Sequence, residues 1–179
     1  MRRGLSAFAV AAVLAVGLTS CEGPPPSDRQ LIGTFRAKRQ VFETLRQKLC
    51  ALPHQQTIWT DSNDDSMPKL PAAVRQDYLG LMKRIGVERV AAIPAGRDLN
   101  LPKCAFEASF WSRGFLDQGD SKDIELDPTP DKDALVLDSL DDIDFEHTVR
   151  HFRPPSSHGQ RTYMRHLEGD WWLEWDHWE

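Results

Sequence analysis

The hydrophobic pattern of this chain changes at Gly86 from the period of a helix to the period of a strand. Before this glycine, apolar residues recur at helical spacing over 28–50 and again over 71–85. After it, apolar residues alternate with polar ones in short segments, of which 104–112 is the clearest. Helices followed by a run of strands predict one α+β domain, with two N-terminal helices packed on an antiparallel sheet.

Local signals set further boundaries within this pattern. Ser27 and Gln30 have the spacing of a capping box, which predicts that the first helix begins there. Gly86 is a natural residue for the end of the second helix. The polar stretch 53–68 is interpreted as a loop.

The amino-terminal residues have the pattern of a bacterial export signal. Arg2 and Arg3 precede an uncharged run from Gly4 to Leu18, and the run ends in Leu18-Thr19-Ser20-Cys21. These four residues resemble a lipobox, in which the cysteine is acylated and becomes the first residue of the mature protein. A plain secretory signal that contains a cysteine and a retained membrane helix are the two alternatives.

The lipobox divides the chain into three parts. Residues 1–20 are the predicted lipoprotein signal peptide, 21–27 the lipidated tether, and 28–179 a single α+β domain. A palmitate-bearing Cys21 predicts a protein of the cell envelope that is anchored in the bilayer and faces the periplasm. Glu22 stands where inner-membrane lipoproteins of enterobacteria carry aspartate, so the outer membrane is the predicted location.

Two cysteines remain in the predicted mature chain, Cys50 and Cys104. An oxidising compartment allows a disulfide to form and persist, so we predict that they form a bridge. Closing a loop of this length would stabilise the fold by about 4 kcal/mol at most. Two unpaired buried thiols are the alternative, because the sequence does not show that the two residues are within reach.

Several short motifs, taken together, resemble a family of small uncharacterised proteobacterial lipoproteins. The resemblance follows the mature chain in order and covers most of it. It implies no activity and no catalytic residue. The matching motifs are Tyr78 to Gly86 followed by Val87, Trp111-Ser112-x-Gly114 with Gly119 and Lys122, Leu137-Asp138-Ser139-Leu140-Asp141, and Tyr163-x-x-x-Leu167-x-Gly169-x-Trp171-Trp172-Leu173.

Negative charge is concentrated in one part of the chain. The whole chain has a net charge of −5 and no dense block of basic residues, which argues against nucleic-acid binding. Residues 117–146 contain 12 acidic residues and 2 lysines. Three interpretations stay open: solvated loops, a calcium site without the usual loop spacing, and a docking face for a basic protein. The candidate docking residues are Asp138, Asp141, Asp142 and Asp144.

Two aromatic-rich segments, 161–167 and 171–178, flank the turn signal Glu168-Gly169-Asp170 and predict a terminal β-hairpin. Side chains alternate between the two faces of a strand. In the last strand, Trp172 and Trp178 share a face with two acidic residues, so they are candidate partner-binding residues. Tryptophans that close over a helix are the alternative.

Five of the six histidines lie in the last 33 residues, which raises the question of a metal site. His147 and His151 are four residues apart, but their surroundings alternate like a strand, in which four residues span about 13 Å. One ion cannot bridge that distance, so we predict no metal site. No phosphate-binding glycine loop or nucleophile motif is present in the sequence, and no cofactor is predicted.

These observations favour a non-catalytic lipoprotein with a protein-binding or structural role in the envelope. One alternative within that class is an inhibitor or immunity protein that neutralises a cationic envelope hydrolase or toxin, since an acidic segment would steer a basic partner. An alternative from another class is a metal-dependent hydrolase that uses the C-terminal histidines.

Overall fold

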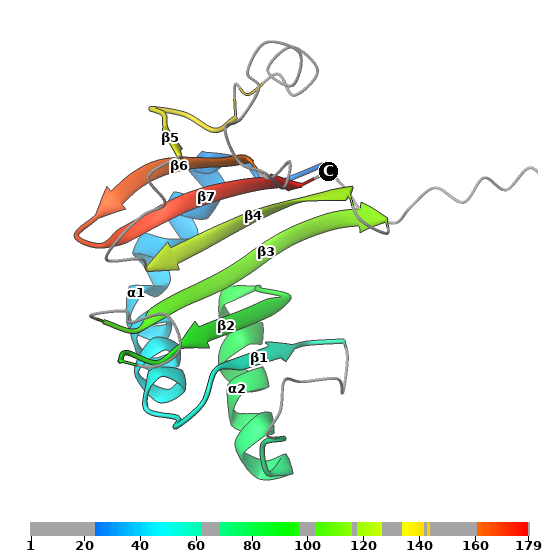
Figure 1. Cartoon of the computed structure of the whole chain (residues 1–179), viewed down its shortest axis with the longest axis vertical. Helices are drawn as coiled ribbons and strands as arrows, with labels where there is room; N and C mark the ends of the chain where they lie inside the picture. Colours follow the sequence, from blue (N-terminus) through cyan, green and yellow to red (C-terminus); the bar gives the residue numbers. More distant parts are fainter. Residues whose placement is uncertain are drawn as a thin grey trace, which may run out of the picture.

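A computed structural model describes residues 24–61, 69–96, 103–115, 118–126, 134–141, 143 and 161–178. Within them the chain forms two helices and one seven-stranded sheet with the strand order β1-β2-β3-β4-β7-β6-β5 (Figure 1). The elements are α1 (Asp28–Cys50), β1 (Gln56–Trp59), α2 (Ala72–Ile85), β2 (Arg89–Ile93), β3 (Ala105–Phe115), β4 (Gln118–Leu126), β5 (Leu135–Val136), β6 (Arg161–Glu168) and β7 (Trp171–Trp178).

The described strands are mostly antiparallel, which confirms the α+β class. Only the short edge strand β5 runs parallel to its neighbour, β6. The two longest strands, β3 and β4, pair in the middle of the sheet, and β7 lies beside β4. β6 and β7 pair antiparallel on either side of the turn at Gly169 and Asp170.

The strand β1 lies inside 53–68, so the prediction of a loop is wrong for residues 56–59. Ile58 is fully buried and pairs with Val90 of β2. The stretch carries few apolar residues beyond Ile58 and Trp59, so the strand conformation of 56–59 depends on pairing with β2. Such tertiary context overrides a weak local preference.

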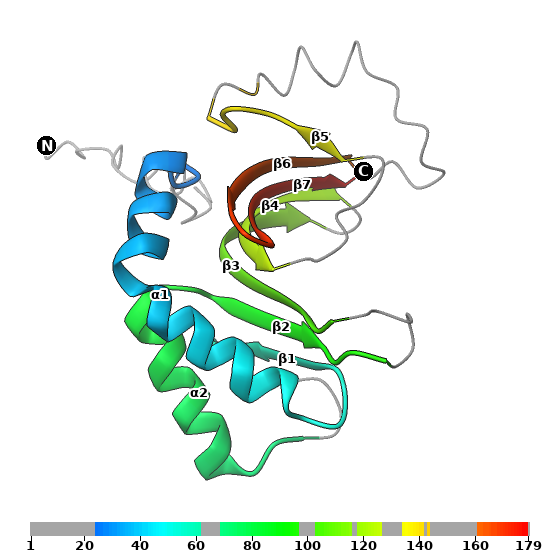
Figure 2. The same cartoon turned by 90° about the vertical axis from the view of Figure 1, so that its left-hand side faces the viewer.

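Both helices lie on the same side of the sheet (Figure 2). The Phe35 and Phe42 rings of α1 are buried and lie 5.2 and 6.1 Å from the Trp171 ring of β7, measured between centroids. Phe106 of β3 contacts the same tryptophan from within the sheet. This aromatic cluster joins α1 to the central strands, and the opposite side of the sheet carries neither helix.

The ends of the helices follow their sequence signals. The hydroxyl of Ser27 accepts a hydrogen bond from the Gln30 amide, and the Gln30 side chain accepts one from the Ser27 amide, which confirms the capping box. Gly86 ends α2 with φ of 83°, a left-handed conformation that favours glycine.

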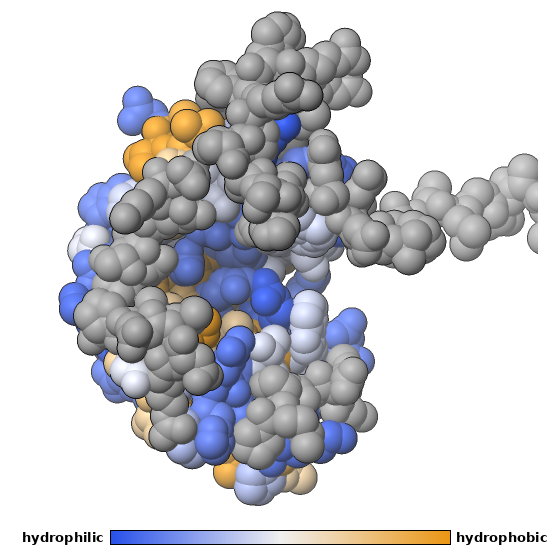
Figure 3. Space-filling view, viewed as in Figure 1, coloured by the Kyte–Doolittle hydropathy of each residue, from blue (hydrophilic) through white to orange (hydrophobic). Residues whose placement is uncertain are grey.

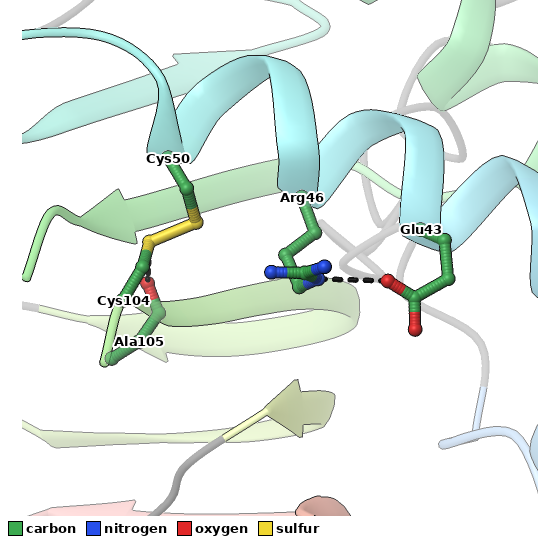
Figure 4. The surroundings of a disulfide bond; sticks show 5 residues. All are labelled: Glu43, Arg46, Cys50, Cys104 and Ala105. Carbon is green, nitrogen blue, oxygen red and sulfur yellow. Dashed lines mark hydrogen bonds and ion pairs between the residues drawn. A yellow bond between two sulfur atoms is a disulfide. The ribbon is translucent and has the colours of Figure 1, made fainter. Parts of the chain in front are cut away.

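A disulfide joins Cys50, the last residue of α1, to Cys104, directly before β3 (Figure 4). The two Cα atoms are 5.9 Å apart, a distance typical of disulfides. The predicted bridge is therefore present, and it ties the carboxyl end of α1 to the start of the longest strand.

The described part of the chain contains no helix that is long and apolar enough to cross a membrane. The predicted signal peptide, and Cys21 with it, lie outside the described residues.

Candidate functional site

A buried group of charges holds the first turn of α1 against the sheet. Lys122 of β4 is 0% exposed, and its Nζ atom lies 2.8 Å from Oδ1 of Asp28 and 2.9 Å from Oδ1 of Asp141. Arg165 of β6 reaches Oδ2 of Asp28 at 2.8 Å. The backbone amide of Leu140 donates to the same Oδ2 atom. Two cations and two carboxylates therefore compensate one another at the point where the chain enters the fold.

The environment of Asp28 favours its charged form. Burial would raise the pKa of this carboxyl, but the Leu140 amide and the hydrogen bonds and charges of Lys122 and Arg165 outweigh burial and lower it. The Lys122 ammonium also lies 5.2 Å from the centroid of the Trp175 ring. A cation over an aromatic face gains further stabilisation.

The predicted docking residues Asp138, Asp141, Asp142 and Asp144 do not share one role. Asp141 accepts two hydrogen bonds from the Asp28 backbone amide, at 2.8 and 3.0 Å, in addition to its ion pair with Lys122. The Asp141 carboxylate therefore helps to hold the first turn of α1 beside β4. Asp138 is exposed. Asp142 and Asp144 lie outside the described residues, so their docking role stays a prediction.

A second set of acidic side chains lies on the helix-free side of the sheet. We call it the acidic face, and it consists of Glu107 on β3, Asp123 and Glu125 on β4, and Glu174 and Asp176 on β7. The pairing of the strands brings these residues together, because Glu107 is opposite Glu125 and Asp123 is opposite Glu174. Figure 3 shows this side of the molecule, where hydrophilic residues lie in the middle.

Burial and mutual repulsion raise the pKa values of three members of the acidic face, Glu107, Asp123 and Glu174. Burial raises the pKa of Glu107 to about 8; the charge of Asp123 adds to this shift and Arg89 opposes it. Burial also raises the pKa of Glu174 well above its usual value, and contacts with Glu125 and Asp176 add to the shift. Neighbouring carboxyls that cannot all ionise share protons.

Asp123 is the most buried member of the acidic face, with 2% of the residue exposed. Burial raises the pKa of Asp123 to about 6, against the hydroxyl groups of Ser109 and Ser121, which lower it. The Ser121 hydroxyl donates a hydrogen bond of 2.7 Å to Oδ2 of Asp123. Deprotonation of this carboxyl is therefore possible near neutral pH but is opposed by its surroundings.

Arg89 of β2 is the one arginine or lysine on this side of the described strands. Its guanidinium forms an ion pair with Glu107 and stacks over the Trp59 ring at 5.3 Å from the centroid. The five carboxyls of the acidic face therefore outnumber the arginines and lysines that the described strands place on this side of the sheet.

The two candidate tryptophans lie on the same side as the acidic face. Trp172 is opposite Glu125 of β4 and contacts the ring of His166, with 4.8 Å between centroids. Trp178 lies at the far end of β7, opposite Gly119. An added Cβ atom at Gly119 would lie 2.3 Å from the Trp178 ring, so this contact requires glycine. Trp172 is half-buried beside the carboxyls, whereas Trp178 packs against the β4 backbone.

The two histidines of the described hairpin make polar contacts of their own. A ring nitrogen of His166 lies 2.8 Å from the Gly169 carbonyl oxygen. Nδ1 of His177 lies 2.8 Å from Asp120, whose other oxygen accepts a hydrogen bond from Arg113. Among the described residues, no group of three or more His, Cys, Asp or Glu side chains is placed to hold a metal ion. The other C-terminal histidines, His147, His151 and His158, lie outside these residues.

The sequence interpretation missed Lys122 as a buried charge and Glu107, Asp123 and Glu125 as part of a site. The available signal was alternation with apolar neighbours, since Glu107 lies between Phe106 and Ala108, and Asp123 and Glu125 lie on either side of Ile124. Which strand neighbours β4 decides whether these residues form a cluster, and local sequence does not show that.

Comparisons of the chain with models of protein families, with curated proteins and with solved structures find no match.

Proposed function

We propose that this protein is a lipid-anchored, non-catalytic lipoprotein of the bacterial envelope that binds a partner protein or has a structural role there. The observation that carries the proposal is the anchoring of Asp28. Residues 21–27 would form a short tether between an acylated Cys21 and the first turn of α1. The ion pairs of Asp28 with Lys122 and Arg165 would transmit a pull on that tether directly to the sheet.

The disulfide supports the proposed compartment. A disulfide such as the one between Cys50 and Cys104 forms and persists in an oxidising compartment, of which the periplasm is an example. In this proposal the anchored body is the unit of two helices on an antiparallel sheet that ends in the 161–178 hairpin. The outer membrane is the proposed site of attachment, on the basis of Glu22.

The test of the anchor is the distribution of Cys21→Ser between membrane and soluble fractions. We expect the wild-type chain to stay in the membrane fraction after a carbonate wash and the variant to be released. Cys50→Ser with Cys104→Ser is a control that also removes cysteines but leaves the lipidation site intact. A C21S variant that stays in washed membranes would refute the lipid anchor.

The concentration of negative charge favours a second candidate function within the same class. An inhibitor or immunity protein for a cationic envelope hydrolase or toxin would use acidic surfaces to steer its basic target. Survival of cells that express such a hydrolase, with and without this protein, tests that role. Equal survival would refute the inhibitor or immunity role, and it would not bear on the proposed lipid anchor.

The metal-dependent hydrolase would need the C-terminal histidines to bind an ion. Metal analysis of protein purified without a histidine tag tests it, and we expect less than one equivalent of zinc. One equivalent of zinc that is lost in His147→Ala or His151→Ala would promote the hydrolase over the binding protein.

A further inference from the structure

The two helices are far more basic than the chain as a whole. α1 and α2 contain nine arginines and lysines and only three acidic residues, whereas the whole chain has a net charge of −5. The three acidic residues, which each form an ion pair within the described structure, are Asp28, Glu43 and Asp77. The helical layer therefore has an excess of positive charge that its own carboxylates do not balance.

Five cations of this layer are exposed and take part in no ion pair with the described residues. We call them the basic face, which consists of Arg29, Arg36, Lys38, Lys83 and Arg84. Arg29 and Arg36 are seven residues apart, which is about two turns, so they share one side of α1. The last turn of α2, with Lys83 and Arg84, lies beside the middle of α1 (Figures 1 and 2). The packing of the helices thus gathers cations that are far apart in sequence.

A break in α1 brings one of these cations to the surface. Leu31 and Leu45, seven residues before and after Lys38, are both buried. A straight helix would therefore turn Lys38 toward the sheet. Instead Lys38 has non-helical dihedral angles, φ −120° and ψ 19°, and is exposed. α1 is interrupted at a position where a regular helix would bury a lysine.

We propose that the basic face docks on the anionic phospholipid headgroups of the bilayer that holds the acylated Cys21. The helices then lie against the membrane surface, and the opposite side of the sheet faces away from it. The inference rests on the proposed lipid anchor, and it is tested by a measurement that separates the two.

The tether ends where the basic face begins. Cys21 and Asp28 are seven residues apart, and an extended chain of that length spans at most about 25 Å. Lys38 lies about 15 Å further along α1, at 1.5 Å per residue. The field of an anionic surface reaches only about 8 Å at physiological salt. A short tether is therefore needed to hold the basic face within range of the headgroups, and this chain provides one.

Several weak attractions add up on such a surface. Each lysine or arginine near an anionic membrane strengthens binding by about fivefold. An acyl chain alone fixes the distance of the anchored body from the bilayer but not which side it turns toward the membrane. Contacts of the basic face would set that orientation and leave the helix-free side, which carries Trp172, open to the compartment.

The test uses the acylated chain, added from detergent to preformed vesicles of phosphatidylcholine alone or of equimolar phosphatidylcholine and phosphatidylglycerol. A short pulse of an amine-acetylating reagent, followed by mass spectrometry, measures the reactivity of each lysine. We expect Lys38 and Lys83 to react about fivefold more slowly on the anionic vesicles. Lys103, which is 63% exposed and lies at the far end of α1 beside the disulfide, should react equally on both. High salt should abolish the protection, because it screens exposed charges.

The decisive variant is Arg36→Gln with Arg84→Gln, which removes two cations of the basic face and keeps both reporter lysines. Lys69→Gln with Lys103→Gln removes the same charge at two exposed positions outside the basic face. Loss of two cations should weaken docking by about tenfold or more, so the first variant should lose most of the protection and the second should keep it. Melting temperatures show that both variants are folded.

Flotation of the same mixtures separates docking from anchoring. The acylated chain should float with both kinds of vesicle. Flotation with both, combined with equal reactivity of Lys38 and Lys83 on both, would refute the docking and leave the anchor standing. Flotation with the anionic vesicles alone, with both lysines protected, would support the basic face and refute the anchor. A chain that floats with neither would refute both. Equal loss of protection in the two double variants would overturn the assignment of docking to the basic face.

Discussion

The ammonium group of Lys122 lies 2.8 Å from the carboxylate of Asp28, and both side chains are closed off from solvent. Lys122 belongs to the central strand β4, and Asp28 to the first turn of α1. Charges inside a protein are tolerated only when they are compensated. The pair therefore fixes where α1 begins on the sheet, at the point where the predicted tether reaches the fold.

We predict that Lys122→Met lowers the free energy of unfolding by about 3 kcal/mol, because removing one partner leaves buried carboxylates uncompensated. Lys103→Met is the matched control, since Lys103 forms an ion pair with Asp170 while 63% exposed. Exposed pairs contribute about 0–1 kcal/mol. Urea unfolding measures both variants, and equal losses would contradict the structural role of Lys122.

The next prediction separates two of the acidic residues first considered for docking. Asp141→Ala should cost about 1–3 kcal/mol, because the Asp28 amide and Lys122 lose an acceptor. Asp138→Ala should change stability by about 0.5 kcal/mol or less, as expected for an exposed position. Thermal unfolding decides the matter, and a stable Asp141 variant would return this residue to the candidate docking surface.

Features carried by local sequence could be predicted. The capping box at Ser27, the left-handed end of α2 at Gly86 and the alternation of the last strand all follow from neighbouring residues. The Cys50–Cys104 bridge followed from the number of cysteines and the predicted compartment.

Features that depend on which strands meet could not be predicted. Residues 56–59 form the strand β1 because they pair with β2, where Ile58 is opposite Val90, a residue far away in sequence. The residues of the acidic face lie together because β7 pairs with β4, which places Glu174 opposite Asp123. Lys122 lies in a segment rich in acidic residues, and its burial depends on a network with Asp28 of α1 and Arg165 of β6, which are both far away in sequence.

The disulfide predicts a loss of stability when it is removed. Cys50→Ala with Cys104→Ala should lower the free energy of unfolding by about 4 kcal/mol or less, since the bridge closes a loop of 54 residues. Mass spectrometry of the exported chain without reductant should show no free thiol at either position. Alkylation of both cysteines under these conditions would contradict the bridge in the cell.

The acidic face makes a prediction about pH that has a definite sign. Glu107 has a folded pKa of about 8 against a usual value of 4.5, so the folded chain holds a proton that the unfolded chain has already lost between these values. Stability should therefore fall as the pH rises from about 4.5 to about 8, and Glu174, whose pKa is also raised, should contribute in the same direction. Asp28 acts oppositely, because its pKa is lowered and its contribution is lost only below about pH 4.

Glu174→Gln tests this assignment, because the amide keeps the shape of the carboxyl and cannot ionise. We expect the variant to melt a few degrees above the wild type at about pH 8, where about 1 kcal/mol corresponds to 2–4 °C for a domain of this size. At about pH 4.5 the two should melt together, since Glu174 is then protonated in the folded wild type. Asp138→Asn removes the same charge at an exposed position and should leave both melting temperatures unchanged. A Glu174→Gln variant that is less stable at the higher pH would show that this carboxylate is paired with a cation and that the acidic face is already neutralised within the chain.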